Sequence, residues 1–166
     1  MANPKDPIPP VWREGGLTYS TGLMFDTARK MIDAAMAEAK KQGLAMGIAI
    51  ADAGGNLIAF GRMDDAMLVS IQIAMDKAFT AVYGKVPTQI WRTIVQAGHI
   101  PPLFFHERWT AFAGGFPLIK GKQLFGGIGC SGATAYGDTS VARAGLLAGG
   151  FSAEDADTIL KELNEG

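Results

Sequence analysis

The sequence is poor in cysteine, histidine and charge. Its 166 residues include one cysteine and two histidines, and 19% of them are charged, with a formal net charge of −1. A single cysteine excludes an intramolecular disulfide framework and a zinc site of the Cys-x-x-Cys type, and it suits a reducing compartment. Without a basic excess, binding to DNA, RNA or an anionic membrane surface has no electrostatic basis. We therefore expect neither a nucleic acid nor a membrane as a partner.

Long hydrophobic runs are also missing. No stretch of about 18 uninterrupted apolar residues occurs, and the N-terminus lacks the apolar core of a signal peptide. These absences predict a cytoplasmic protein. Residues 1–19 are rich in proline, which removes a backbone donor and fixes φ, so we expect a non-helical arm there. The remaining residues, 20–166, have the length of a single domain.

Glycine, by contrast, is abundant at 22 of 166 residues, so the sequence specifies many turns or close backbone approaches. Uncharged runs around glycine-containing turns predict two β-hairpins, with strands at 44–51 and 56–63 and at 116–119 and 124–131. Hydrophobic periodicity predicts helices over about 21–42, capped by Ser20 or Thr21, over 67–83 and 139–148, and from Thr88 and Ser152. This order predicts an α+β fold in which helices flank a largely antiparallel β-sheet.

The last of these strands is unusual because glycine occupies its interior. Gly127 and Gly129 leave one face of the strand almost bare backbone. Glycine within a strand costs stability unless a helix or a ligand approaches the backbone closely, and the sequence leaves both alternatives open. Cys130 shares a strand face with Ile128, which predicts a buried, unreactive thiol rather than a nucleophile.

Both histidines, His99 and His106, lie in a stretch over 97–110 that we expect to be the longest loop, because Pro101-Pro102 interrupts a helix there. Seven residues apart across two prolines, they match no compact ligand spacing. No metal site is therefore predicted.

The same loop contains the candidates for proton transfer. His106 is followed directly by Glu107, and imidazole titrates near neutral pH, so this pair is a candidate general acid and base. Trp109 would supply an apolar wall for a ligand, and His99 is a further ligand-binding candidate. The alternative for each histidine is a loop residue bonded to a backbone carbonyl or to water.

Two cations are candidates for binding an acidic ligand. Lys77 falls in a helix with few polar positions, and Arg62 shares a strand face with Ile58 and Phe60. A buried charge needs a partner, and arginine can hold a carboxylate in a bidentate fork. The alternative for Lys77 is a structural ion pair with a neighbour such as Asp52, and for Arg62 a surface role at the end of the strand.

Four segments of the chain carry a family resemblance. In order they are 48–64, 74–81, 114–118 and 126–132, which include the runs Asp-Ala-Gly-Gly-Asn, Asp-Lys-Ala, Gly-Gly-Phe-Pro-Leu and Gly-Gly-Ile-Gly-Cys-Ser-Gly. Together they resemble the GlcG/HbpS/PduO C-terminal family, also called the haem-degrading domain family. Each segment alone is weakly specific, whereas their combined order is specific and covers about residues 20–150.

The resemblance implies a profilin-like antiparallel sheet flanked by helices, in a chain that forms homo-oligomers. Family members have been linked to haem or corrinoid-related ligands, and others lie in catabolic pathways for small organic acids. Haem-binding relatives use a histidine near the start of the first helix, and the matching stretch here, 17–26, contains none. The sequence therefore predicts no cofactor, unless His99, His106 or a methionine binds haem instead.

These observations predict a small-molecule enzyme or binder of a catabolic pathway, with a small anionic metabolite as its partner. Arg62 and Lys77 would bind the acid, and His106 and Glu107 would transfer protons without a cofactor. Hydration, elimination, hydrolytic dehalogenation and tautomerisation are the reactions this chemistry allows. The alternative is a haem- or tetrapyrrole-binding protein without catalysis.

Overall fold

The computed structural model describes residues 18–20, 22–99 and 102–152. Most of the proline-rich arm and the helix expected after Ser152 lie outside these residues. The described end of the arm forms a two-residue strand, β1 (Thr18–Tyr19).

Within the described ranges the helices alternate with two β-hairpins. The helices are α1 (Phe25–Lys41), α2 (Val69–Gly84), α3 (Thr88–Gln96), the 3-10 helix η2 (Pro102–Phe105) and α4 (Ala135–Ala148). The hairpin strands are β2 (Gly47–Asp52) with β3 (Leu57–Arg62), and β4 (Gly115–Lys120) with β5 (Gln123–Ser131). None of the described helices is long and apolar enough to cross a membrane.

The sheet is built around β5. This strand pairs antiparallel with β2 on one side and with β4 along the other, and β3 pairs antiparallel with β2. The short β1 adds a parallel pairing to the first two residues of β5. The predicted α+β fold, with a profilin-like antiparallel sheet between helices, is confirmed.

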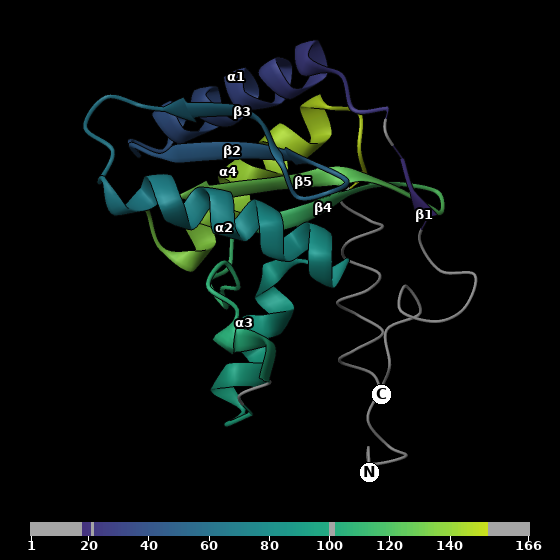
Figure 1. Ribbon diagram of the computed structural model, residues 1–166. Coiled ribbons are helices and arrows are strands. Elements are labelled where there is room, and N and C mark those ends of the chain that lie inside the picture. The colour runs from purple at the N-terminus through teal and green to yellow at the C-terminus, as the bar shows by residue number, and fades with distance from the viewer. Residues whose placement is uncertain (1–17, 21, 100–101, 153–166) are drawn as a thin grey trace.

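Two layers of helices enclose the sheet. Figure 1 shows α1 and α2 on opposite sides of it, and α3 pointing away from it. On the α1 side, α4 packs beside α1, and both cover the larger strand residues, such as Ile48, Ile50 and Ile128. On the other side, α2 covers a face made of small residues, including Ala49 and Ala51. Burial of apolar surface on both faces stabilises this arrangement.

Two helix boundaries differ from the sequence prediction. The first helix begins at Phe25 without a side-chain cap, because Ser20 continues the extended segment and its hydroxyl accepts from the Gly22 amide. The last described helix begins earlier than expected, at Ala135, because the Thr134 side chain caps it. Both ends are decided by short local hydrogen bonds that hydrophobic periodicity does not register.

Thr88 also has a different role from the one expected. It is the first residue of α3 rather than its cap, and its buried hydroxyl accepts from the Gly115 amide at 2.9 Å. This bond joins the start of α3 to the start of β4 and so fixes α3 against the edge of the sheet.

Candidate functional site

The bare face of β5 is occupied by a helix and not by a ligand. A Cβ atom on Gly127 would lie 2.5 Å from the carbonyl oxygen of Ala78, and one on Gly129 would overlap the backbone of Ala74. Glycine therefore lets the α2 backbone lie almost on the strand backbone. This close approach resolves the alternative that the sequence leaves open, and it carries Lys77 into the interior.

Lys77 is buried in an ion pair. Its side chain is 1% exposed, and its Nζ donates to Asp138 Oδ2 at 2.6 Å and to the carbonyl oxygen of Cys130 at 2.8 Å. The second oxygen of Asp138 accepts from the Ala133 amide at 2.8 Å. The partner of the lysine is thus Asp138 rather than Asp52, whose carboxylate bonds to the β2–β3 turn at Gly54.

Burial acts against the charge of both members of the pair. It lowers the pKa of Lys77 and raises the pKa of Asp138, while the attraction between them opposes both shifts. Burial also raises the pKa of the Cys130 thiol, which agrees with the predicted unreactive cysteine. A buried ion pair whose charges are opposed by desolvation is either a structural element or a part of a binding site.

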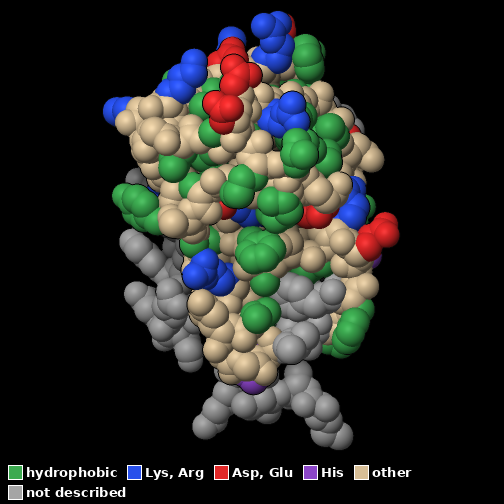
Figure 2. Space-filling view, turned by 90° about the vertical axis from the view of Figure 1, so that its left-hand side faces the viewer, with side chains coloured by type: hydrophobic (Ala, Val, Ile, Leu, Met, Phe, Trp, Pro, Cys, Tyr) green, Lys and Arg blue, Asp and Glu red, His purple; other side chains and the backbone are tan. Residues whose placement is uncertain are grey.

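The pair borders a pocket, which we call the Lys77 pocket, of about 200 Å³. Apart from Lys77 and Asp138, its polar lining consists of Arg92 on α3 and Ser131 at the end of β5. The remaining lining residues are apolar or backbone: Met67, Val69, Ile73, Phe112, Ala113, Gly132, Ala133 and Ala135. Figure 2 views the side of the molecule on which α2 begins, where exposed hydrophobic side chains lie between acidic and basic ones.

Arg62 and Lys77 are not brought together. Arg62 is exposed at the end of β3 and lines a separate hollow with Met36, Lys40 and Asp64. That hollow lies beside α1, whereas Lys77 is on the α2 side of the sheet. The proposed cooperation of these two cations on one carboxylate therefore has no basis in the fold.

His106 and Glu107 are both exposed, and neither lines any of the three pockets described. The His106 ring stacks on Phe79 of α2, with centroids 5.4 Å apart, and its Nδ1 accepts from the Arg108 amide. The Arg108 guanidinium lies 4.1 Å from the centre of the Phe79 ring. These contacts fix the loop on α2, and the catalytic role of His106 and Glu107 stays a prediction.

The other two loop candidates are also placed apart from Lys77. His99 is exposed just after α3, and its amide donates to the Ile94 carbonyl. Trp109 packs into the α2-side core, where its ring meets Trp91 edge to face at 5.1 Å. Among the described residues, no group of three His, Cys, Asp or Glu side chains has a geometry that could hold a metal ion.

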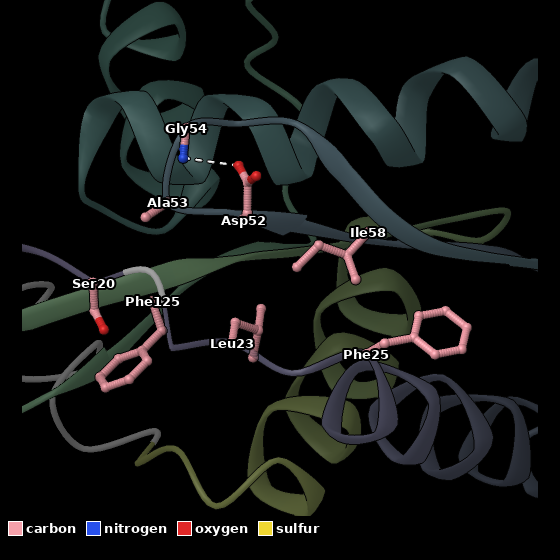
Figure 3. A pocket seen from close by; sticks show the side chains of 8 residues that line it. All are labelled: Ser20, Leu23, Phe25, Asp52, Ala53, Gly54, Ile58 and Phe125. Atoms are coloured by element: carbon pink, nitrogen blue, oxygen red, sulfur yellow. Dashed lines mark hydrogen bonds between the residues drawn. The ribbon is translucent and has the colours of Figure 1, made fainter.

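A second and larger pocket, which we call the α1-start pocket, has a volume of about 370 Å³. Its apolar walls are Leu23 and Phe25 at the start of α1, Ile58 on β3 and Phe125 on β5. Figure 3 shows Leu23 and Ile58 extending into the space between α1 and β3, while the Asp52 carboxylate turns toward the amide of Gly54. The side chains that line the pocket are therefore mainly hydrophobic, and its one carboxylate is already engaged.

The side chains that line the α1-start pocket meet some of the requirements of haem and not others. Its volume falls within the range of small-molecule sites, and its aromatic and aliphatic walls suit the faces of a porphyrin ring. Its described lining offers no nitrogen or sulfur side chain to iron, and the Ser20 hydroxyl and Asp52 Oδ1 accept hydrogen bonds from nearby backbone amides. The apolar walls are thus chemically compatible with a porphyrin ring, and the described lining supplies no strong ligand to its metal.

Two residues of the Lys77 pocket escaped the sequence prediction. Asp138 falls just before the expected helix over 139–148, yet it occupies the same helical face as Val141, Ala142 and Leu146. A carboxylate on a buried helical face indicates a buried partner, and a correct helix start would have revealed it. Arg92 carries no such pattern, because only the docking of α3 brings it to the pocket.

Comparison with known proteins identifies relatives of similar length and fold. Protein GlcG from Escherichia coli (strain K12) is 36% identical over 113 residues, which are 66% of this chain and 81% of GlcG. HbpS from Streptomyces reticuli, solved as a double mutant, is 36% identical and superposes with a TM-score of 0.70. The match covers 81% of this chain and 92% of the HbpS chain. The PduOC:haem complex is 32% identical with a TM-score of 0.71, over 76% of this chain and 94% of that chain.

The prediction that no cofactor is involved is corrected by these relatives. It rested on the missing histidine near the start of the first helix. A relative of the same fold has nevertheless been solved as a haem complex, and the matching family is described by haem degradation. The absence of one ligand type does not exclude binding of the group, since ring contacts contribute independently of the metal.

A family model covers most of the described domain. The model described as "Haem degrading protein HbpS-like" matches residues 23–147, from the last residues before α1 to the penultimate residue of α4. This range includes all four antiparallel strands and the lining residues of all three described pockets apart from Ser20. The chain therefore belongs to the HbpS-like family.

Proposed function

We propose that this protein binds haem or a related tetrapyrrole in the α1-start pocket. The observation that carries the proposal is the hydrophobic wall formed there by Leu23, Ile58 and Phe125, at the start of the first helix. A family relative crystallised with haem supports the choice of ligand. The pocket holds the ring by apolar contact, so binding does not depend on a histidine of this chain.

The experiment is a titration of the full chain with hemin and with metal-free protoporphyrin IX, followed by absorbance and by quenching of tryptophan fluorescence. Because the described lining holds no nitrogen or sulfur ligand, we expect the two Kd values to agree within about threefold. A Kd for hemin that is far lower than that for protoporphyrin would show that iron ligation dominates, against the proposal.

Strand β3 provides a matched pair of variants for the α1-start pocket. Ile58 lines it, whereas its neighbour Leu57 is half exposed and does not. Ile58→Asp would place a carboxylate against the ring, and we expect affinity for either porphyrin to fall at least about tenfold. Leu57→Asp should leave the affinity unchanged, with both variants checked for folding by circular dichroism.

The two histidines serve as a further control for the same titration. Neither His99 nor His106 lines the α1-start pocket. His99→Ala and His106→Ala should therefore leave the hemin Kd and the position of the Soret band as in the parent chain. A shift in either variant would place the haem at the loop instead.

Assembly into a homo-oligomer is part of the proposal. Large hydrophobic side chains that line none of the described pockets are exposed, including Leu68, Tyr83 and Tyr136, and such groups favour burial in a contact between chains. We expect light scattering to give a mass that is a multiple of the 17.5 kDa chain. A mass of one chain at micromolar concentration would contradict this expectation.

A further inference from the structure

We infer that the Lys77 pocket is a second binding site, separate from the α1-start pocket, and that it takes a small monocarboxylate with an apolar tail. The inference starts from the hydrogen-bond capacity of Lys77. An ammonium group has three donors, and two of them are used by Asp138 and the carbonyl of Cys130. The third has no partner among the described residues, although the side chain is buried and borders the pocket.

Arg92 supplies the second group. Arg92 lines the pocket from α3, and its side chain has no hydrogen-bond or ion-pair partner among the described residues. Guanidinium groups bind carboxylates through two parallel hydrogen bonds. The guanidinium of Arg92 from α3 and the third ammonium donor of Lys77 from α2 would give the acid group of a ligand two points of attachment.

The charges around the pocket specify the charge of the ligand. The lining contains two cations, Lys77 and Arg92, and one anion, Asp138. Lys77 and Asp138 neutralise each other in their ion pair, so that Arg92 leaves one positive charge uncompensated. A monoanion balances this charge, whereas a dianion would leave an excess in a partly desolvated site.

The apolar lining and the volume of the Lys77 pocket limit the size and polarity of the rest of the ligand. Met67, Ile73 and Phe112 contribute apolar side chains to the lining of the same pocket. The volume of about 200 Å³ is below the range of drug-sized ligands, which begins near 300 Å³. A short aliphatic acid meets both conditions, and a porphyrin does not.

The test uses butyrate as the probe and the neutral butyramide as its isostere, with the full chain observed by amide NMR. We expect butyrate to shift the amide signals of Gly132 and Ala133, which border the pocket, and butyramide to bind at least about tenfold more weakly. No shift with butyrate, or equal binding of the two probes, would overturn the inference.

Two arginine variants complete the experiment without touching the buried pair. Arg92→Gln should weaken butyrate binding at least about tenfold, because the fork is lost. Arg62→Gln removes a positive charge on the other side of the sheet and should leave the affinity for butyrate unchanged. Equal loss in both variants would indicate general charge attraction and would refute a site at Arg92. Neither change is expected to alter hemin binding, so the two proposals succeed or fail independently.

Discussion

Replacing Asp138 by leucine should lower the free energy of unfolding by about 3–5 kcal/mol at neutral pH, as measured by urea denaturation. The change leaves the ammonium of Lys77 buried with a single carbonyl as partner, and an unpaired buried charge carries most of its desolvation penalty. Lys77→Met should lower the free energy of unfolding by a similar amount, because it leaves the carboxylate of Asp138 without its cationic partner.

The double variant Lys77→Met with Asp138→Leu is the control that separates charge from packing. Removing both charges leaves no unpaired group, and apolar side chains of similar size fill the space, so most of the lost stability should return. If the double variant is as unstable as the sum of the single variants, the pair contributes through shape and not through its charges.

The Asp138→Leu variant should also acquire a pH dependence of defined sign. Burial lowers the pKa of Lys77 from its ordinary value of 10.5, and loss of the carboxylate removes a contribution that raises it. Between the folded and the ordinary pKa, the unfolded chain binds more protons than the folded one, so the free energy of unfolding rises with pH. The stability deficit should therefore shrink as pH approaches 10, and a deficit that grows with pH would contradict an unpaired lysine.

Adding a single methyl group at Gly129 is the second change expected to have a large effect. Its Cβ would overlap the backbone carbonyl of Ala74, which is held in the hydrogen-bonded interior of α2. Neither backbone can move without separating helix from strand. Gly129→Ala should cost about 3 kcal/mol or more, at the upper end for overpacking, in the same urea experiment.

Gly121→Ala is the matched control for this substitution. Gly121 has φ of 58°, and nothing lies within 4 Å of the position its Cβ would occupy. This variant carries only the conformational cost of a left-handed residue, about 1–2 kcal/mol. If Gly129→Ala were no more harmful than Gly121→Ala, the close approach of α2 to β5 would not be a constraint on the fold.

The Lys77 pocket illustrates where prediction from the sequence ends. The helix containing Lys77 and the glycines beneath it are readable from composition and periodicity, and the close approach of one to the other was one of two stated alternatives. The partner of Lys77 was not readable, because Asp138 lies 61 positions away and just outside the helix expected there. Arg62 was a reasonable candidate by residue type, but it lies on the other side of the sheet.

The sequence by itself determined the α+β class, the two hairpins, the burial of Cys130 and the family, because these depend on the spacing of apolar residues and glycines along the chain. Tertiary structure alone decided that Lys77 pairs with Asp138, that Arg92 joins their pocket and that His106 rests on Phe79 at the surface. Local patterns fix which face of an element is buried. The neighbour that each face meets depends on how separate elements dock, and docking is set by contacts between residues far apart in the chain.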